Sequence, residues 1–196
     1  MNQPLTKPAI TPPPLSCDTH AHVFGPAHRY PFAADRDWTP PDRPVSEYAA
    51  MLDSLGMARG VIVHSSSHGT DNHVTLDAIA HMQGRCLGIA VLAPEVSDLE
   101  LELLHEGGMR GVRISTMLKS AMGVQHIEAM AGRFRELGWN IQLHFDRAEE
   151  IIELAPLLRR LPVPVVFDHM ARARGGAGVQ APAFQTLLKL LRDCDH

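Results

Sequence analysis

The chain has 196 residues, of which 45% are hydrophobic and 20% are charged, and its formal net charge is -4. This size and apolar content suit one well-buried domain, and two domains would be cramped. The small negative charge gives no electrostatic reason to expect nucleic acid or an anionic membrane as a partner. No apolar run is long enough to cross a bilayer, and residues 1–15 lack the apolar core of a signal peptide, so we expect a cytoplasmic protein.

The cysteine and histidine content indicates which kinds of site the chain can form. The three cysteines, Cys17, Cys86 and Cys194, are far apart and form no CxxC spacing. They are typical of reduced thiols, and they predict neither a disulfide framework nor a zinc site. The 12 histidines are the unusual feature, because several lie where strands are expected to end.

The predicted elements alternate along the chain. Residues 1–14 are rich in proline and predict a flexible arm, and residues 15–196 carry the fold. Short apolar runs predict strands at 15–23, 60–66, 86–92, 109–115, 139–145 and 163–169. Helical spacing predicts helices at 45–55, 72–82, 99–107, 126–137, 149–161 and 182–193. Asp71 or Asn72 is expected to cap the second helix, and Ser97 or Asp98 the third.

The strands are continuous apolar runs, as expected for a parallel sheet that helices cover on both faces. This α/β pattern fits an open doubly wound sheet or a (β/α)₈ barrel. No glycine-rich phosphate-binding motif follows the first strand, which removes the usual reason for an open nucleotide-binding sheet. In both architectures, ligands bind at the carboxyl ends of the strands.

Polar side chains gather where the strands are expected to end. They are His20 and His22; His64, Ser66 and His68; Arg113 and Lys119; His144 and Asp146; and Asp168 and His169. Side chains two residues apart on a strand share one face, with positions roughly 6.6 Å apart. His20 and His22 are therefore expected to point the same way, where they can bind one metal ion or polarise one carbonyl group.

Some of these residues have an ordinary structural interpretation. A neutral histidine that bonds a loop carbonyl would explain His64 or His68. Asp168 is expected either to cap the loop after the sixth strand or to orient His169. Arg113 follows an apolar strand and, if buried, needs an anion, which is either a substrate carboxylate or a protein acid. Trp38 is in a position to cover the mouth of a site.

Six segments carry a family resemblance: CDTHAHVFGP, RYPF, HGTDN, GMRGVRIS, GWNIQLHFD and VPVVFDHMAR. Together they resemble the amidohydrolase superfamily, in the branch of 2-pyrone-4,6-dicarboxylate lactonase and related lactone hydrolases. The resemblance extends from about Leu15 to the end of the chain. It implies an α/β fold, a distorted TIM (β/α)₈ barrel, and the hydrolysis of a carboxylated lactone in the catabolism of aromatic compounds. It also implies that no bound metal is required.

The resemblance assigns roles to particular residues. Catalytic residues around the lactone carbonyl would be His20, His22 and His169, and Ser66, Arg113 and Lys119 would hold the substrate carboxylates. Trp38 and His144 stand where the lactonase has tyrosines that contact substrate. Lys119 stands in place of an arginine and would read a carboxylate less specifically, because an ammonium group cannot form a bidentate fork.

His144 opens a metal-dependent alternative, because metal-binding relatives present histidine on the fifth strand. In that case a divalent metal such as Zn²⁺ would be held by His20, His22, His144 and His169. The enzyme would then be a metal-dependent amidohydrolase that acts on another lactone, amide or carboxylate.

One feature of the family is missing. Its general base, an aspartate in a GTDWPHP-like segment of the eighth strand, is absent from the 196 residues. A whole barrel typically needs about 250 residues, so we expect a barrel truncated after about six βα units. An inactive fragment, or a subunit completed by a partner chain, is therefore a further alternative, and a homo-oligomer is left open.

Overall fold

A parallel strand followed by a helix is the repeating unit of this chain. The computed structural model describes residues 8–118 and 121–194, so Lys119 and residues 1–7 of the predicted arm lie outside the described residues. The described chain forms two compact units. The first runs to Ala90 and includes Leu103–Met109, and the second includes Val91–Glu102 and continues from Arg110.

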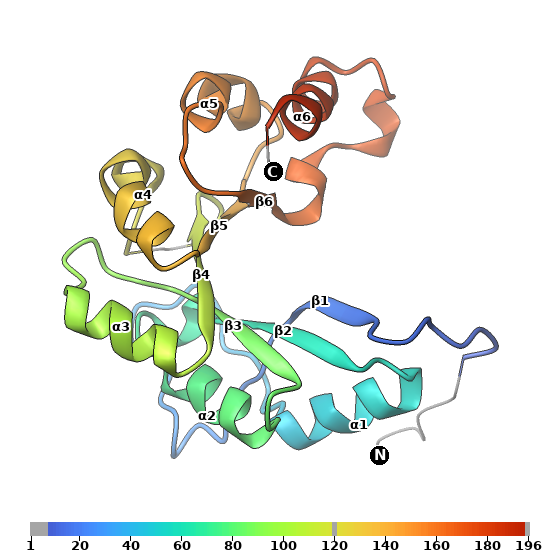
Figure 1. Ribbon diagram of the computed structural model, residues 1–196, viewed down its shortest axis with the longest axis vertical. Coiled ribbons are helices and arrows are strands. Elements are labelled where there is room, and N and C mark those ends of the chain that lie inside the picture. The colour runs from blue at the N-terminus through green and yellow to red at the C-terminus, as the bar shows by residue number, and fades with distance from the viewer. Residues whose placement is uncertain (1–7, 119–120, 195–196) are drawn as a thin grey trace. The chain divides into compact units, whose positions relative to one another are not determined.

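The first unit contains three parallel strands in chain order. They are β1 (Cys17–Ala21), β2 (Arg59–Val63) and β3 (Cys86–Ala90), and the helices α1 (Val45–Leu55) and α2 (His73–His81) follow β1 and β2. Both helices lie along one face of these strands (Figure 1). Leu52 of α1 and Ile62 of β2 lie in the apolar layer between them, each 0% exposed.

Tyr48 explains why β2 needs a glycine. Its hydroxyl donates a hydrogen bond of 3.1 Å to Oδ2 of Asp18 on β1. A side chain at Gly60 would overlap that hydroxyl group. The glycine therefore lets α1 approach the sheet closely enough for Tyr48 to reach β1.

The second unit repeats the pattern. Its strands are β4 (Met109–Ser115), β5 (Asn140–His144) and β6 (Val165–Phe167), and its helices are α4 (Ile127–Glu136), α5 (Glu150–Leu158) and α6 (Pro182–Asp193). The remaining helix, α3 (Asp98–Glu106), spans the boundary between the units. β4, β5 and β6 pair in parallel, and α5 packs against α6 (Figure 1). The register places Ser115 opposite His144 at the carboxyl ends of their strands.

The six predicted strands and six predicted helices are all confirmed, and only their ends differ. Ser97 caps α3, since its Oγ accepts a hydrogen bond of 3.1 Å from the backbone N–H of Glu100. β6 has three residues instead of the seven predicted. Before β6, Pro164 has no N–H to donate to the sheet. After β6, a left-handed turn begins at His169. Among the described residues, no helix is both long and apolar enough to cross a membrane.

Candidate functional site

His20 and His22, at the end of β1, converge as their spacing predicts. Their Nε2 atoms lie 3.4 Å apart, and the two rings are nearly perpendicular, at 89°. Nδ1 of His22 lies 2.7 Å from the carbonyl oxygen of Val63 at the end of β2. A carbonyl oxygen only accepts hydrogen bonds, so Nδ1 of His22 carries the proton. In the neutral ring, Nε2 then carries the lone pair, and this atom faces Nε2 of His20.

This pair fits two ligand positions of one metal ion. Two nitrogens bound to zinc at about 2.0–2.1 Å in tetrahedral geometry lie roughly 3.4 Å apart. The N–H of His22 bonded to a carbonyl oxygen is also the usual support of a metal-binding imidazole. Among the described residues, no group of three or more histidine, cysteine or acidic side chains is placed to hold a metal. The predicted four-histidine set therefore stays a prediction.

An aromatic group borders the histidine pair in the first unit. The ring of Phe24 lies 5.9 Å from that of His22 and 6.2 Å from that of His68. Trp38 packs edge-on against Phe24 at 5.8 Å and is 46% exposed. Trp38 is thus held beside the histidine pair with part of its ring open to solvent, and its contact with a substrate remains a prediction.

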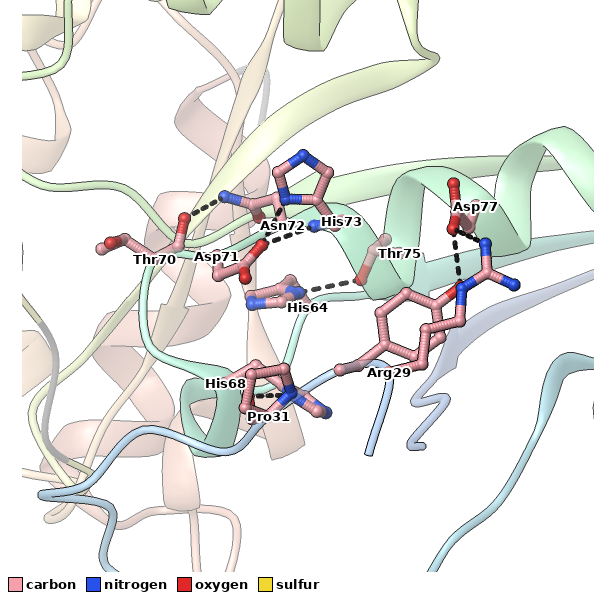
Figure 2. Close-up of polar contacts among 11 residues, drawn as sticks. Arg29, Pro31, His64, His68, Thr70, Asp71, Asn72, His73, Thr75 and Asp77 are labelled. Atoms are coloured by element: carbon pink, nitrogen blue, oxygen red, sulfur yellow. Dashed lines mark hydrogen bonds and ion pairs between the residues drawn. The ribbon is translucent and has the colours of Figure 1, made fainter. Parts of the chain in front are cut away.

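His64 and His68 turn inward from the loop after β2 (Figure 2). Nδ1 of His64 lies 2.9 Å from Oγ1 of Thr75, and Nδ1 of His68 lies 3.2 Å from the carbonyl oxygen of Pro31. Both residues are buried, with exposures of 0% and 4%. Burial lowers the pKa of His64 to about 3 and also lowers the pKa of His68, so both rings are neutral. These contacts support the structural interpretation of both histidines.

Ser66 begins the short 3₁₀ turn Ser66–His68 in the same loop. Ser65 caps this turn, because its side chain accepts a hydrogen bond from the N–H of Ser67. Ser66 is half-buried, and within the described part of the chain its hydroxyl makes no hydrogen bond. Its side chain is therefore available to a ligand.

Several bonds fix the long loop between β1 and α1 to this region (Figure 2). Asp77 on α2 accepts hydrogen bonds from Arg29 at 2.7 Å and from the Tyr30 hydroxyl at 2.6 Å. The N–H of Ala33 donates to the carbonyl of Ser67 at 2.9 Å. Asn72 is the N-cap residue of α2, and Oδ1 of Asp71 before it accepts a hydrogen bond of 3.1 Å from the N–H of His73. The loop that carries Trp38 is thus tied to α2 and to the Ser66 turn.

Arg113, in the second unit, was expected to need either a substrate carboxylate or a protein acid as its anion. Its Nε donates to Oδ2 of Asp168 at 3.0 Å, and the two side chains are only 6% and 2% exposed. Burial lowers the pKa of Arg113, and the charge of Asp168 opposes that shift. The anion that Arg113 needs is therefore a protein acid, and its role toward a substrate carboxylate remains a prediction. Asp168 thus pairs with Arg113, and its expected capping of the loop or orientation of His169 stays a prediction.

His144 and His169 lie together in the second unit, with ring centroids 5.2 Å apart at 73°. Nδ1 of His144 lies 3.2 Å from Oγ of Ser115, the residue opposite it in the sheet. The pKa of His144 is lowered to about 4, chiefly by burial and then by the charge of Arg113. His144 is therefore a neutral ring at pH 7, in the state needed to bind a metal or accept a proton.

The turn after β6 has an unusual backbone. His169, Met170, Ala171 and Arg172 have φ angles of 52°, 53°, 50° and 60°, which form a left-handed turn without glycine. Left-handed backbone costs roughly 1–2 kcal/mol for each such residue. Strain of this kind is concentrated at functional sites, where surrounding contacts maintain it. The turn holds His169 exposed beside His144.

A cavity of 1010 Å³ adjoins this turn, between the loop after β5 and the segment that leads into α6. Its lining includes His169, Met170, Arg172, Arg174, Ile152 and Arg147. Arg172 was not among the predicted site residues, although it lies only three residues after His169. Thr75 and Ser115 were missed as well, because side-chain partners of buried histidines have no spacing that identifies them.

The chain is similar to known hydrolases over most of its length. The sequence model of a family described as Amidohydrolase matches residues 17–196. The chain is 40% identical over 183 residues to 4-sulfomuconolactone hydrolase of Hydrogenophaga intermedia, covering 92% of this chain and 60% of that protein. It is 37% identical over 190 residues to a 2-pyrone-4,6-dicarboxylate hydrolase of Comamonas testosteroni, covering 96% of this chain and 62% of that protein. The chain therefore spans about three fifths of the length of these relatives.

A solved structure agrees in fold. It is a crystal structure of a probable 2-pyrone-4,6-dicarboxylic acid hydrolase from Acinetobacter baumannii with citric acid bound. It superposes with a TM-score of 0.77 at 28% identity, covering 90% of this chain and 66% of that chain. This agreement confirms the predicted α/β class and the amidohydrolase-type barrel for the part of the barrel that the chain spans.

Proposed function

Because the chain belongs to the amidohydrolase family, we propose that it is a hydrolase that opens a carboxylated lactone in the catabolism of aromatic compounds. The observation that carries the proposal is the His20–His22 pair, whose Nε2 atoms converge at 3.4 Å. The bond from His22 to Val63 fixes Nδ1 as the protonated nitrogen of that ring and Nε2 as the nitrogen with the lone pair. The 40% and 37% identities to two lactone hydrolases supply the substrate class.

The proposed reaction is water attack on the lactone carbonyl carbon. A C–O bond forms as one proton of the water passes to solvent, and the carbonyl becomes a tetrahedral oxyanion. The ring C–O bond then breaks, and the second water proton ends on the ring oxygen, which leaves a carboxylate and an enol or alcohol. His20, His22 and His169 are the proposed catalytic residues at the carbonyl oxygen. Imidazole groups fixed at that position stabilise the oxyanion more than the uncharged ground state, which accelerates the reaction.

The acidic groups of the substrate need separate partners. We assign them to Ser66, Arg113 and Lys119, with Trp38 and His144 as further contacts. The unoccupied hydroxyl of Ser66 supports its assignment. The Nε of Arg113 is bonded to Asp168, so Arg113 would reach a carboxylate through its Nη atoms. The structure of a relative with citric acid bound supports a site for a compound with several carboxylates.

Water activation is the step that these residues do not supply. The aspartate of the family's GTDWPHP-like segment is not among the 196 residues. We therefore assign no general base within this sequence. Losing such a base slows a reaction by about 10²–10⁴-fold, so we expect ring opening by this chain to be slower than by the Comamonas hydrolase by at least that factor.

A metal-dependent hydrolase of another lactone, amide or carboxylate is the second candidate. The observation that favours it is the spacing of His20 and His22, which fits two nitrogens on one ion. His20 and His22 would hold the metal, with His144 and His169 as the other proposed ligands. A bound Zn²⁺ would polarise the scissile carbonyl.

The experiment is a ring-opening assay with two lactones, 2-pyrone-4,6-dicarboxylate and 4-sulfomuconolactone. The purified chain is assayed before and after a chelator, and again after zinc is restored. Turnover that survives the chelator supports the metal-independent lactonase, and loss that zinc reverses supports the metal-dependent enzyme. Turnover no faster than buffer for both lactones would contradict the proposed activity.

We also propose a cytoplasmic location, which the three free cysteines favour because such thiols persist in a reducing compartment. Two further proposals follow the sequence analysis: a small carboxylated lactone is the partner molecule, and a homo-oligomer remains open to test by light scattering.

A further inference from the structure

The structure assigns a positioning role to Asp18: we propose that its carboxylate, held by Tyr48 of α1, fixes the irregular end of β1 that turns His20 and His22 to one side of the sheet. The inference rests on the proposed function for the role of the histidine pair. It adds two residues that act through the backbone of His20 and not through contact with a substrate.

The first argument is a β-bulge at the end of β1. Asp18 pairs with Gly60 of β2, whereas Ala21 pairs with Ile62. Three steps along β1 therefore lie beside two steps along β2, which leaves one extra residue on β1. A bulge of this kind bends its strand and is common beside active sites, where it re-aims a side chain. His20 lies within the bulged segment.

The second argument begins with the face on which Asp18 lies. Its Oδ2 accepts a hydrogen bond of 3.1 Å from the Tyr48 hydroxyl on α1. Gly60, its partner in the sheet, faces the same helix, since a side chain there would overlap that hydroxyl group. Asp18 therefore lies on the face of the sheet that α1 covers.

The histidines lie on the opposite face. Ala21 pairs with Ile62, which is fully buried in the apolar layer under the helices. Neighbours in register share a face and successive residues alternate, so His22 points away from the helices. The contact of 3.4 Å between the two Nε2 atoms places His20 with it. A regular strand would put Asp18 on the same face as both histidines, and the bulge reverses that alternation.

The third argument is the set of bonds that holds the bulge. Oδ1 of Asp18 accepts a hydrogen bond of 3.4 Å from the backbone N–H of His20. Aspartate that bonds an N–H two residues later forms a local turn in place of a regular ladder. This bond is long, and Tyr48 anchors the carboxylate at its other oxygen. Burial and then the charge of Asp18 raise the pKa of Tyr48, so its hydroxyl keeps the proton that it donates.

Two separate supports thus fix the histidine pair. Tyr48 holds Asp18, and Asp18 holds the N–H of His20. On the other side, Nδ1 of His22 is bonded to the carbonyl of Val63. Misplacing a group at a reacting atom by about 1 Å costs up to roughly 100-fold in rate. Loss of the support through Asp18 should therefore slow the reaction without removing either imidazole.

The test uses variants that remove one bond at a time. Asp18→Ala removes both bonds, and Asp18→Asn keeps an oxygen that accepts from the N–H of His20. Tyr48→Phe keeps the buried ring and removes only the hydroxyl, so it should fold even where Asp18→Ala does not. The matched control is Tyr30→Phe, because the Tyr30 hydroxyl donates to another carboxylate, that of Asp77, at 2.6 Å.

The first measurement is a nitrogen NMR spectrum of the histidine rings at about pH 8, where an ordinary histidine is neutral. His20→Asn and His22→Asn identify the signals of the pair. We expect these signals to move in Asp18→Ala and, by less, in Tyr48→Phe. They should stay near those of the wild type in Asp18→Asn and should not change in Tyr30→Phe.

The second measurement is the rate of 2-pyrone-4,6-dicarboxylate ring opening. We expect kcat per folded molecule to fall by about 10- to 100-fold in Asp18→Ala and by less in Tyr48→Phe. KM should change little, because other residues are assigned to the acidic groups of the substrate. Asp18→Asn should recover most of the loss in kcat.

A role in stability alone would lower the melting temperature and leave kcat and the ring signals as in the wild type. That result in folded Asp18→Ala and Tyr48→Phe would overturn the inference, and ring opening by the wild type would then still support the proposed function. If the ring signals move as expected but neither lactone is opened, the proposed function fails and the positioning role of Asp18 stands.

Discussion

Two loops, each directly after a strand and each rich in histidine, differ in what their side chains contact. The loop after β2 buries His64 and His68 against Thr75 and Pro31, within a set of hydrogen bonds that also ties down the chain before α1 (Figure 2). The loop after β6 leaves His169 exposed on a strained left-handed turn beside a cavity. The first loop packs its histidines against the fold, and the second leaves its histidine exposed at a cavity, where a ligand contact is the prediction.

The difference teaches that residue type and position after a strand do not by themselves assign a function. A histidine in either loop looks alike in the sequence. Burial and hydrogen-bond partners separate them, because a buried neutral ring with a satisfied nitrogen stabilises the fold. An exposed ring on a strained backbone is typical of functional sites, where surrounding contacts maintain the strain.

The largest expected effect is on ring opening. His20→Asn should lower the rate by about 10²–10³-fold, since it removes a group fixed at the developing oxyanion. The melting temperature should stay near that of the wild type, because His20 supports little of the core. The control is His81→Asn on the exposed end of α2, which should leave both quantities unchanged. A rate within threefold of the wild type in His20→Asn would remove this histidine from the proposed mechanism.

The next effect concerns the buried ion pair of the second unit. Asp168→Leu should decrease the free energy of unfolding by about 3–5 kcal/mol, because it leaves the Arg113 guanidinium buried without its partner. The double variant Arg113→Met/Asp168→Leu should recover most of that loss. Urea unfolding followed by circular dichroism measures both.

The control for this pair is Glu128→Gln, which breaks the exposed ion pair with Arg160 and should cost about 0–1 kcal/mol. A double variant as unstable as Asp168→Leu would mean that the two side chains do more than neutralise one another.

His64 provides the corresponding test in the first unit. His64→Ala should decrease the free energy of unfolding by about 2–4 kcal/mol, since it opens a cavity and leaves the Thr75 hydroxyl without its partner. The rate of ring opening per folded molecule should stay within a few-fold of the wild type. A stable variant that has lost activity would instead place His64 among the catalytic residues.

The smallest expected effect is the pH dependence of stability. Burial lowers the pKa of His64 to about 3, below the value of about 6.5 typical of an unfolded chain. Between these values the unfolded chain binds a proton that the folded chain does not. The free energy of unfolding contributed by this group is therefore fully present above pH 6.5 and decreases as the pH falls toward 3, by up to about 1.4 kcal/mol per pH unit.

Urea unfolding of wild type and His64→Gln between pH 5 and 7, above the range where most carboxylates titrate, isolates this contribution. The slope of stability against pH should be shallower in the variant. Identical slopes would show that His64 takes up no proton on unfolding in this range.

The sequence was sufficient for the order of elements and for the convergence of His20 and His22, because both follow from local periodicity. Apolar runs located all six strands, and the two-residue repeat of a strand brought the histidines to one side. Contacts between distant segments were not accessible in this way. The partner of Arg113 lies 55 residues away, and nothing local distinguishes Asp168 from a substrate carboxylate.

The backbone conformation after β6 was the other feature that the sequence did not predict. The left-handed turn 169–172 contains no glycine, so no residue type announces it, and it ended β6 earlier than its apolar run predicted. Lys119 lies outside the described residues, so its assignment still rests on the resemblance alone.

The most direct test of the account is to measure, in one set of preparations, the initial rate of 2-pyrone-4,6-dicarboxylate ring opening and the melting temperature of wild type, His22→Asn and His64→Ala. The account predicts that the wild type opens the lactone faster than buffer. His22→Asn should lose that rate with its melting temperature kept, and His64→Ala should lose melting temperature with its rate per folded molecule kept. Equal rates in wild type and His22→Asn, or a wild-type rate equal to that of buffer, would contradict it.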